Sequence, residues 1–242
     1  MTRAPTAPRI RPLGEAALSV EFGDRIDEAI NARVHALDAA LAADPLPGQA
    51  ETVPSYRALL VVFDPERADL AAARARLADM AAHPPAKAGA GRHWRVPVLY
   101  GGEAGPDLDA IAAHAGLAPE AYAARHAGGR YRVHMIGFQP GFCYLGGLDP
   151  ALAMPRRAEP RLTIPARSVS IGGVQTAIGT VAGPSGWHVI GRTPVRPFDP
   201  ARAPAFLFAP GDAISFHPVG AEEWAVLEAE AAAGAPVAER LA

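Results

Sequence analysis

Hydrophobic residues at the start of the chain follow first a strand period and then a helical period. Leu18, Val20 and Phe22 alternate with polar neighbours, which predicts a half-buried strand. Apolar residues between positions 30 and 41 then recur every three or four residues, as on one face of a helix. Asp27 stands where it can cap that helix. This part of the chain therefore predicts a strand followed by a helix.

The same mixture of strand and helix patterns continues to residue 100. The remaining elements are expected at 52–53 (strand), 56–63 (strand), 70–80 (helix) and 94–100 (strand). The resulting order, βαββαβ, is the ferredoxin-like arrangement. Segment 83–91 is rich in Pro, Ala and Gly, which is typical of a linker, so the domain border is expected at residue 88.

The pattern changes in the second half of the chain, to many short strands beyond Arg130. Two short helices come first, one at 107–116 with Asp107 as its cap and one that starts near Pro119. Short apolar runs then alternate with Gly and Pro, which is typical of a β-barrel or sandwich, and a closing helix is expected at 222–233. The chain is thus predicted to be an α+β protein with domains at 1–88 and 89–242.

Composition narrows the class of protein. The chain has 242 residues, half of them apolar, which is enough for two cores. A formal net charge of −2 gives no electrostatic case for nucleic acid, and no basic stripe or long apolar run indicates a membrane. The first residues lack the apolar stretch of a secretory signal, and the single cysteine, Cys143, excludes an intrachain disulfide. These features predict a cytoplasmic protein.

Segment 133–155 is the strongest candidate for a binding site. It places Phe138, Phe142 and Tyr144 among glycines and a proline within a few residues. Gly and Pro impose a special backbone path, and rings presented on a rigid turn suit a concave site. A buried turn whose rings only fill the core is the alternative.

Two further segments carry candidate charges. Arg156, Arg157 and Arg161 lie close together, and the guanidinium group suits carboxylate or phosphate, although a solvated charged loop is the alternative. On a regular strand, His188 and Arg192 would share a face, so a titratable base would lie near a fixed cation. A purely structural His188 is the alternative there.

Other chemistry has weaker support. Cys143 has no base or cation near it in the sequence, so a small buried apolar residue is favoured over a nucleophile. The eight histidines are scattered, without an HxH, HExxH or CxxC motif, and no metal site is predicted. Walker A, GxGxxG and GxSxG patterns are also missing from the sequence.

Several motifs, taken in order, resemble the KipI family, also called allophanate hydrolase subunit 1 or the 5-oxoprolinase B subunit (PxpB). In the second half they are GFQPGFCYLGGLDP, PRRAEPRLTIPARSVSIGG, GWHVIGRTP and PGD. In the first half they are LGEAALSVEFGD, VPSYRALLVVFDP and VPVLYGGEAGPDLDAIAAHAGL. The resemblance therefore runs from about Arg11 to Phe216.

The resemblance implies both a fold and an activity. The fold is a ferredoxin-like domain followed by a cyclophilin-like β-barrel. The activity is the ATP-dependent opening of 5-oxoproline to L-glutamate, by a complex with a C subunit (allophanate hydrolase subunit 2-like) and a LamB/YcsF-type subunit. ATP with magnesium would serve the complex, and the chain alone is expected to be inactive.

Other functions stay open within the same resemblance. One is a non-catalytic, KipI-like inhibitor of a sensor histidine kinase, and another is a carboxyltransferase-type subunit acting on a different amide or urea-like substrate. Prolyl isomerase activity, which rests on fold analogy alone, ranks last.

Residue roles follow from the implied reaction. Arginines would hold the substrate carboxylate and a phosphorylated intermediate, aromatic rings would enclose the lactam, and a histidine would move protons. The expected catalytic residues are His188 and Arg192. The expected substrate-binding residues are Phe138, Phe142, Tyr144, Arg157, Arg161 and Gln175.

The chain departs from the family pattern at two places. Where the family usually reads IPAGSV, this chain has Arg167 in place of Gly, and Arg adopts a positive φ less readily. Where the family reads roughly IYPxxSPGGW, this chain reads IGTVAGPSGW at 178–187. Both differences leave the exact substrate open.

Overall fold

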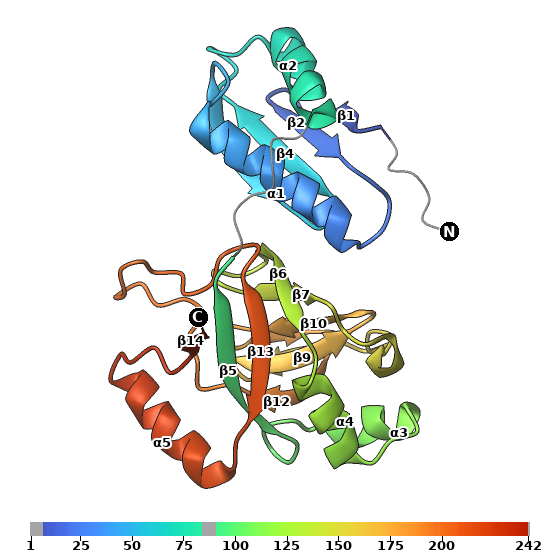
Figure 1. Cartoon of the computed structure of the whole chain (residues 1–242), viewed down its shortest axis with the longest axis vertical. Coiled ribbons are helices and arrows are strands. Elements are labelled where there is room, and N and C mark those ends of the chain that lie inside the picture. The colour runs from blue at the N-terminus through green and yellow to red at the C-terminus, as the bar shows by residue number, and fades with distance from the viewer. Residues whose placement is uncertain (1–6, 84–90, 242) are drawn as a thin grey trace. The chain divides into compact units, whose positions relative to one another are not determined.

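The computed structural model describes residues 7–83 and 91–241. The chain forms two compact units, Met1–Ala90 and Gly91–Ala242, each with its own hydrophobic core (Figure 1). The predicted domain border at residue 88 lies outside the described residues. With helices and largely antiparallel sheets in separate parts of the sequence, the protein is of the α+β class.

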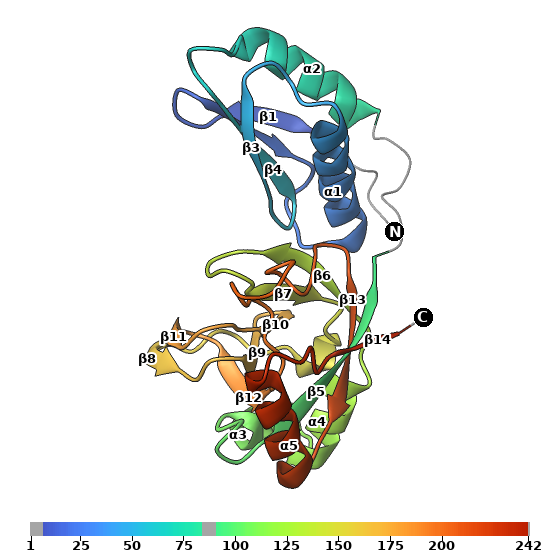
Figure 2. The same cartoon turned by 90° about the vertical axis from the view of Figure 1, so that its left-hand side faces the viewer.

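The first unit is a four-stranded antiparallel sheet with two helices on one face (Figure 2). Its sheet order is β1-β2-β4-β3. The elements are β1 (Arg9–Pro12), β2 (Ala17–Glu21), α1 (Glu28–Ala43), β3 (Gln49–Pro54), β4 (Ala58–Phe63) and α2 (Leu70–Ala82). The predicted helices and the strand near residue 20 are confirmed.

Helix α1 begins where the sequence predicts. The Asp27 carboxylate accepts hydrogen bonds from the N–H groups of Ala29 and Ile30, at 2.9 and 3.1 Å. These are two of the donors that the first helical turn leaves unsatisfied. The apolar face of the helix, including Val34 and Leu37, is buried against the sheet.

The fourth strand of this sheet is not the one that the sequence predicts. Strand β5 (His93–Tyr100) pairs with strands of the second unit, and β1 occupies the edge beside β2 instead. Strand β1 reads RIRP, and only Ile10 packs on the core, so it has no alternating pattern to detect. Val96 and Val98 on β5 belong to the core of the second unit.

The second unit is a closed barrel of seven strands. Every neighbouring pair is antiparallel except β13 and β5, which run parallel, and the β12–β5 pairing closes the ring. The strands in sheet order are β12 (His188–Arg192), β9 (Ser168–Gly172), β10 (Gln175–Ile178), β7 (Cys143–Gly146), β6 (Tyr131–Ile136), β13 (Ala213–Pro218) and β5.

Helices and short strands surround the barrel. Helix α4 contacts β13, α3 contacts β12, and α5 contacts β5 (Figure 1). A separate two-stranded ladder pairs β8 with β11. These elements are α3 (Leu108–His114), α4 (Pro119–Ala127), the 3₁₀ turn η1 (Pro150–Leu152), β8 (Arg161–Ile164), β11 (Gly183–Ser185), α5 (Ala221–Ala232) and β14 (Glu239–Leu241). Over residues 7–83 and 91–241, no helix combines the length and apolar character that crossing a bilayer requires.

Candidate functional site

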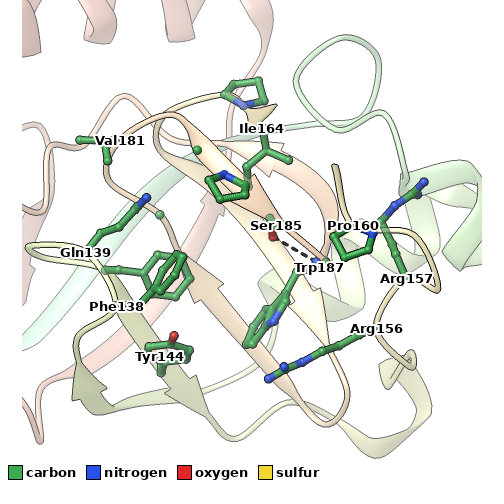
Figure 3. A pocket seen from close by; sticks show the side chains of 16 residues that line it. Phe138, Gln139, Tyr144, Arg156, Arg157, Pro160, Ile164, Val181, Ser185 and Trp187 are labelled. Atoms are coloured by element: carbon green, nitrogen blue, oxygen red, sulfur yellow. Dashed lines mark hydrogen bonds between the residues drawn. The ribbon is translucent and has the colours of Figure 1, made fainter. Parts of the chain in front are cut away.

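A pocket of about 320 Å³ opens on the barrel unit, and we call it the aromatic pocket (Figure 3). Three stretches of chain meet there: the loop before β7, the arginine-rich segment before β8, and the segment between β10 and β12. The lining residues are Phe138, Gln139, Phe142, Tyr144, Arg156, Arg157, Pro160, Ile164, Pro165, Gly179, Val181, Gly183, Pro184, Ser185, Gly186 and Trp187.

The loop before β7 turns sharply and holds its first ring outward. Phe138 and Gly141 have φ angles of 69° and 76°, and Gly137 N–H donates to the Phe142 carbonyl at 3.1 Å. A Cβ at Gly141 would lie 2.6 Å from the Phe198 Cβ, so a larger residue would displace the loop. Phe138 is 68% exposed, so its ring does not fill the core.

Aromatic rings form a continuous wall along the pocket. The Phe142 centroid lies 5.8 Å from that of Phe138 and 4.7 Å from that of Tyr144. Tyr144 in turn meets Trp187 at 5.9 Å and 69°. Edge-to-face pairs of this kind fix the rings relative to one another. The rings of this loop therefore line a pocket, and their role in binding substrate stays a prediction. Trp187 belongs to the same wall but is not among the expected site residues.

Arg156 supplies the positive charge of the aromatic pocket. Its guanidinium carbon lies 5.7 Å from the centroid of Trp187, and it makes no hydrogen bond or ion pair with any described residue (Figure 3). Its charge reaches Tyr144: burial raises the pKa of the Tyr144 hydroxyl, and the Arg156 charge partly opposes that rise. A cation over an aromatic face that keeps its N–H donors available can receive an anionic ligand.

Asp107 holds the other two arginines of this segment. Its carboxylate accepts both N–H groups of Arg161, at 2.6 and 2.8 Å, and one from Arg157 at 3.2 Å. It also accepts the backbone N–H of Val189 at 2.7 Å. Burial raises the pKa of Asp107, but the hydrogen bonds from Arg161 and Val189 and the two positive charges lower it overall.

This arrangement corrects two expectations. Asp107 precedes α3, but its side chain makes no capping hydrogen bond because the arginines occupy it. Arg161 was expected to bind substrate, yet its fork is committed to Asp107 and it does not line the aromatic pocket. Arg157 does line the pocket, although Asp107 engages one of its nitrogens. No local motif indicates that a residue fifty positions upstream pairs with two arginines of this segment.

His188 and Arg192 do not share a face of the sheet, so that prediction is wrong. The register of β12 against β9 shifts between Val189 and Gly191, as at a β-bulge. His188 therefore lies opposite Ile171, and Arg192 lies opposite Ser168. These partners are three positions apart on β9, so the two side chains point to opposite faces.

Both residues also lie outside the lining of the aromatic pocket. His188 is buried, and its Nε2 lies 3.0 Å from the Pro155 carbonyl. The Arg192 Nε donates to the Ala166 carbonyl, and its guanidinium carbon lies 5.4 Å from the centroid of Trp224.

Gln175 and Cys143 are both buried, on opposite faces of the barrel sheet. Gln175 on β10 is 6% exposed, does not line the aromatic pocket, and its Nε2 has no partner within the described chain. Cys143 is fully buried, its thiol faces the Gly141 carbonyl, and burial raises the pKa of the thiol far above its ordinary value. Residues 7–83 and 91–241 contain no group of three or more His, Cys, Asp or Glu side chains that could hold a metal ion.

The two departures from the family pattern are Arg167 and segment 178–187. Arg167 adopts a φ of 61°, the left-handed conformation that Gly would adopt more readily. Its guanidinium forms two hydrogen bonds with the Glu228 carboxylate, both 2.6 Å. Gly179, Gly183 and Ser185 line the aromatic pocket itself.

The second unit thus combines a seven-stranded barrel with a pocket lined by aromatic rings and arginine, a lining whose chemistry suits a small anionic ligand. Comparison with known proteins identifies the family. Residues 8–208 match the model of the carboxyltransferase domain, subdomain C and D. The chain belongs to this family, which includes the KipI proteins and the B subunits of 5-oxoprolinases.

Two relatives match over nearly their whole length. The 5-oxoprolinase B subunit of Bacillus subtilis is 37% identical over 222 residues, which cover 86% of this chain and 91% of the relative. The protein of the same name from Escherichia coli O157:H7 is 40% identical over 207 residues, or 85% and 94% of the two chains.

Solved structures extend the comparison. TTHA0988 is 36% identical with a TM-score of 0.75, and the match covers 88% of this chain but only 40% of that longer chain. PH0987 from Pyrococcus horikoshii is 39% identical with a TM-score of 0.54, and the match covers 89% of this chain and 100% of that chain. The urea carboxylase of Kluyveromyces lactis, 19% identical with a TM-score of 0.79, shows the same fold over 97% of this chain and 24% of its own.

Proposed function

We propose that this chain is the B subunit of an ATP-dependent 5-oxoprolinase complex, which opens 5-oxoproline to L-glutamate. One observation carries the proposal: relatives named as 5-oxoprolinase B subunits are 37% and 40% identical to this chain over more than nine-tenths of their own length. Its partners would be a C subunit and a LamB/YcsF-type subunit, and the complex would act in the cytoplasm.

The aromatic pocket has the chemistry that such a substrate needs. 5-Oxoproline is a five-membered lactam that carries one carboxylate. The rings of Phe138, Phe142 and Tyr144 offer apolar faces to the lactam ring, and Arg156 offers an available cation to the carboxylate. Gln139, which also lines the pocket, can hydrogen-bond the lactam amide.

The reaction itself needs activation of a weak electrophile. Transfer of the γ-phosphoryl group of ATP to the lactam oxygen makes the ring carbon reactive. ADP leaves in this step. Water then attacks that carbon and the C–N bond breaks, which gives γ-glutamyl phosphate. A second water hydrolyses this acyl phosphate to glutamate and phosphate. We assign neither ATP nor magnesium to particular residues of this chain. They belong to the complex in this proposal.

The roles of His188 in proton transfer and of Arg192 in charge stabilisation stay predictions. Neither lines the aromatic pocket, and they lie on opposite faces of β12, so each would act only on substrate that is bound outside this pocket. Alanine substitution of each residue in the assembled complex tests them. Intact activity in both variants would remove the two residues from the mechanism.

The deciding experiment is reconstitution with the partner subunits. Co-purified complex is expected to release glutamate from 5-oxoproline only when ATP is present. Arg156→Gln is expected to raise the KM for 5-oxoproline by about tenfold or more, because it removes a charge-assisted contact to the carboxylate. Arg130→Gln, which removes an exposed arginine elsewhere in the same unit, is the matched control. A stable complex that never produces glutamate would contradict the assignment and indicate another amide or urea-like substrate.

The finer fold assignment is also a proposal. We class the barrel as cyclophilin-like and the first unit as a ferredoxin-like variant. In that variant β1, from the start of the chain, occupies the edge position that the last strand of a βαββαβ unit would take.

A further inference from the structure

A second, smaller pocket lies in the barrel unit, and we call it the arginine pocket. Its volume is about 200 Å³, and it is lined by Arg167, Thr180, Arg196, Pro197 and Phe198. Sites for organic ligands usually measure about 300–1,000 Å³, so this space suits a smaller guest. The chain at 179–181 separates it from the aromatic pocket, since Gly179 and Val181 line the aromatic pocket and Thr180 lines the arginine pocket.

Positive charge is in excess around the arginine pocket. The Glu228 carboxylate is engaged by Arg167 through two hydrogen bonds, so this pair is close to neutral. The half-buried guanidinium of Arg196 makes no hydrogen bond or ion pair with any described residue. Arg192 lies near the same group: burial lowers its pKa, and the Arg167 charge lowers it further. Arg192 and Arg196 thus add positive charge that the Arg167–Glu228 pair does not neutralise, which favours an anion.

A buried hydroxyl gives a second, independent observation. Thr180 is 8% exposed, and its Oγ1 has no hydrogen-bond partner within residues 7–83 and 91–241. Buried polar atoms are almost always paired in folded proteins, because losing water without gaining a partner is costly. The hydroxyl hydrogen can rotate toward an acceptor, and an oxyanion beside Arg196 would supply one.

We propose that the arginine pocket binds a free small oxyanion of the phosphate class, with Arg196 as its charge partner and Thr180 as a hydroxyl donor. The bidentate pair with Glu228 fixes the Arg167 side chain, so that it forms a rigid wall. The small volume favours a free ion over the phosphate of a larger molecule. This site is separate from the proposed 5-oxoproline pocket and can be tested on the chain alone.

The test is calorimetric titration of the purified chain with inorganic phosphate at constant ionic strength. We expect saturable binding at one site per chain. Arg196→Gln should weaken the affinity by about tenfold or more, since it removes a hydrogen bond to a charged group. Thr180→Val keeps the shape of the side chain and should weaken phosphate binding by about threefold to tenfold. The same substitution should leave the thermal stability of the phosphate-free protein unchanged or higher, because a buried hydroxyl without a partner has been removed.

Controls separate this site from general charge effects. Arg130→Gln changes the net charge equally at an exposed residue that does not line the arginine pocket, and it should bind phosphate as the wild type does. Glycerol 3-phosphate should bind more weakly than inorganic phosphate. The proposal is overturned by an absence of saturable binding, by equal losses in Arg196→Gln and Arg130→Gln, or by unchanged binding in Thr180→Val. Equal or tighter binding of glycerol 3-phosphate would overturn the assignment to a free ion.

Discussion

Tyr100 and His126 share a hydrogen bond inside the barrel unit, with 2.8 Å between the tyrosine oxygen and His126 Nδ1. The other ring nitrogen, Nε2, lies 3.0 Å from Thr176 Oγ1, whose hydroxyl donates to the Ser170 carbonyl. Thr176 must therefore accept from His126, which fixes the neutral tautomer with its proton on Nε2. The Tyr100 hydroxyl then donates to Nδ1.

This buried histidine makes the barrel unit sensitive to acid. Burial lowers the pKa of His126 from 6.5 to about 3. Between those values the unfolded chain binds a proton that the folded chain does not. The free energy of unfolding of the barrel unit is therefore unaffected by His126 protonation above pH 6.5. It decreases as the pH falls from 6.5 toward 3, by up to roughly 1.4 kcal/mol per pH unit. Denaturation followed between pH 7.5 and 4.5 measures this slope.

Tryptophan fluorescence can follow the barrel unit alone, because all three tryptophans, Trp94, Trp187 and Trp224, lie in it. His126→Gln should be less stable at pH 7.5 but should show a flatter pH dependence. His114→Gln, which changes an exposed histidine on α3, should keep the wild-type slope. An unchanged slope in His126→Gln would contradict the assignment of the acid sensitivity to this residue.

Asp107 is expected to be the most sensitive charged position beside the aromatic pocket. Asp107→Asn would leave Arg157 and Arg161, each about 30% exposed, without their carboxylate. We expect a loss of about 2–4 kcal/mol in the free energy of unfolding, as for breaking a largely buried ion pair. The exposed neighbour Asp109 offers the control, because Asp109→Asn should change stability by less than about 0.5 kcal/mol. If Asp107→Asn lowers the free energy of unfolding as little as Asp109→Asn does, the two arginines find other partners.

Cys143 should be inert in the folded protein. A fully buried thiol with a raised pKa carries almost no thiolate, so a thiol-specific reagent should react only as fast as the barrel unit unfolds. Adding denaturant should therefore accelerate the reaction in step with the loss of native fluorescence. In the assembled complex, Cys143→Ala should keep its activity. A complete loss of activity, in a variant that still folds and assembles, would support Cys143 as a catalytic nucleophile.

Substitution of Phe138 should affect substrate binding without lowering stability. Its ring is mostly exposed and its backbone has a positive φ, so Phe138→Gly removes little packing and suits the turn. The thermal midpoint should be unchanged or higher, while the KM for 5-oxoproline in the complex should rise. Phe142→Leu, deeper in the same wall, should lower the midpoint as well as the affinity. An unaltered KM in Phe138→Gly would exclude the ring from substrate contact.

Much of the fold could be predicted from the sequence because most elements have a strong local pattern. Helix α1, with Asp27 and its buried face, is set by contacts within a few residues. Strand β1 escaped detection because its pairing with β2 depends on backbone hydrogen bonds, which the RIRP sequence does not encode as a pattern.

The candidate site was harder to predict than the fold. The bulge in β12 adds one residue to the strand and so reverses the face of Arg192, and no local motif announces it. The capture of Arg161 by Asp107 joins positions far apart in the sequence. Arg156 was visible within the arginine-rich segment, but only the tertiary structure distinguishes it from its paired neighbours.

Strand β5 opens the barrel unit, and its neighbour β14 comes from the other end of that unit. His93 lies opposite Leu241 in this antiparallel pair, so the two ends of the unit emerge side by side. A host protein could thus accept the whole barrel as an insert in a surface loop, with little entropy lost in joining the ends.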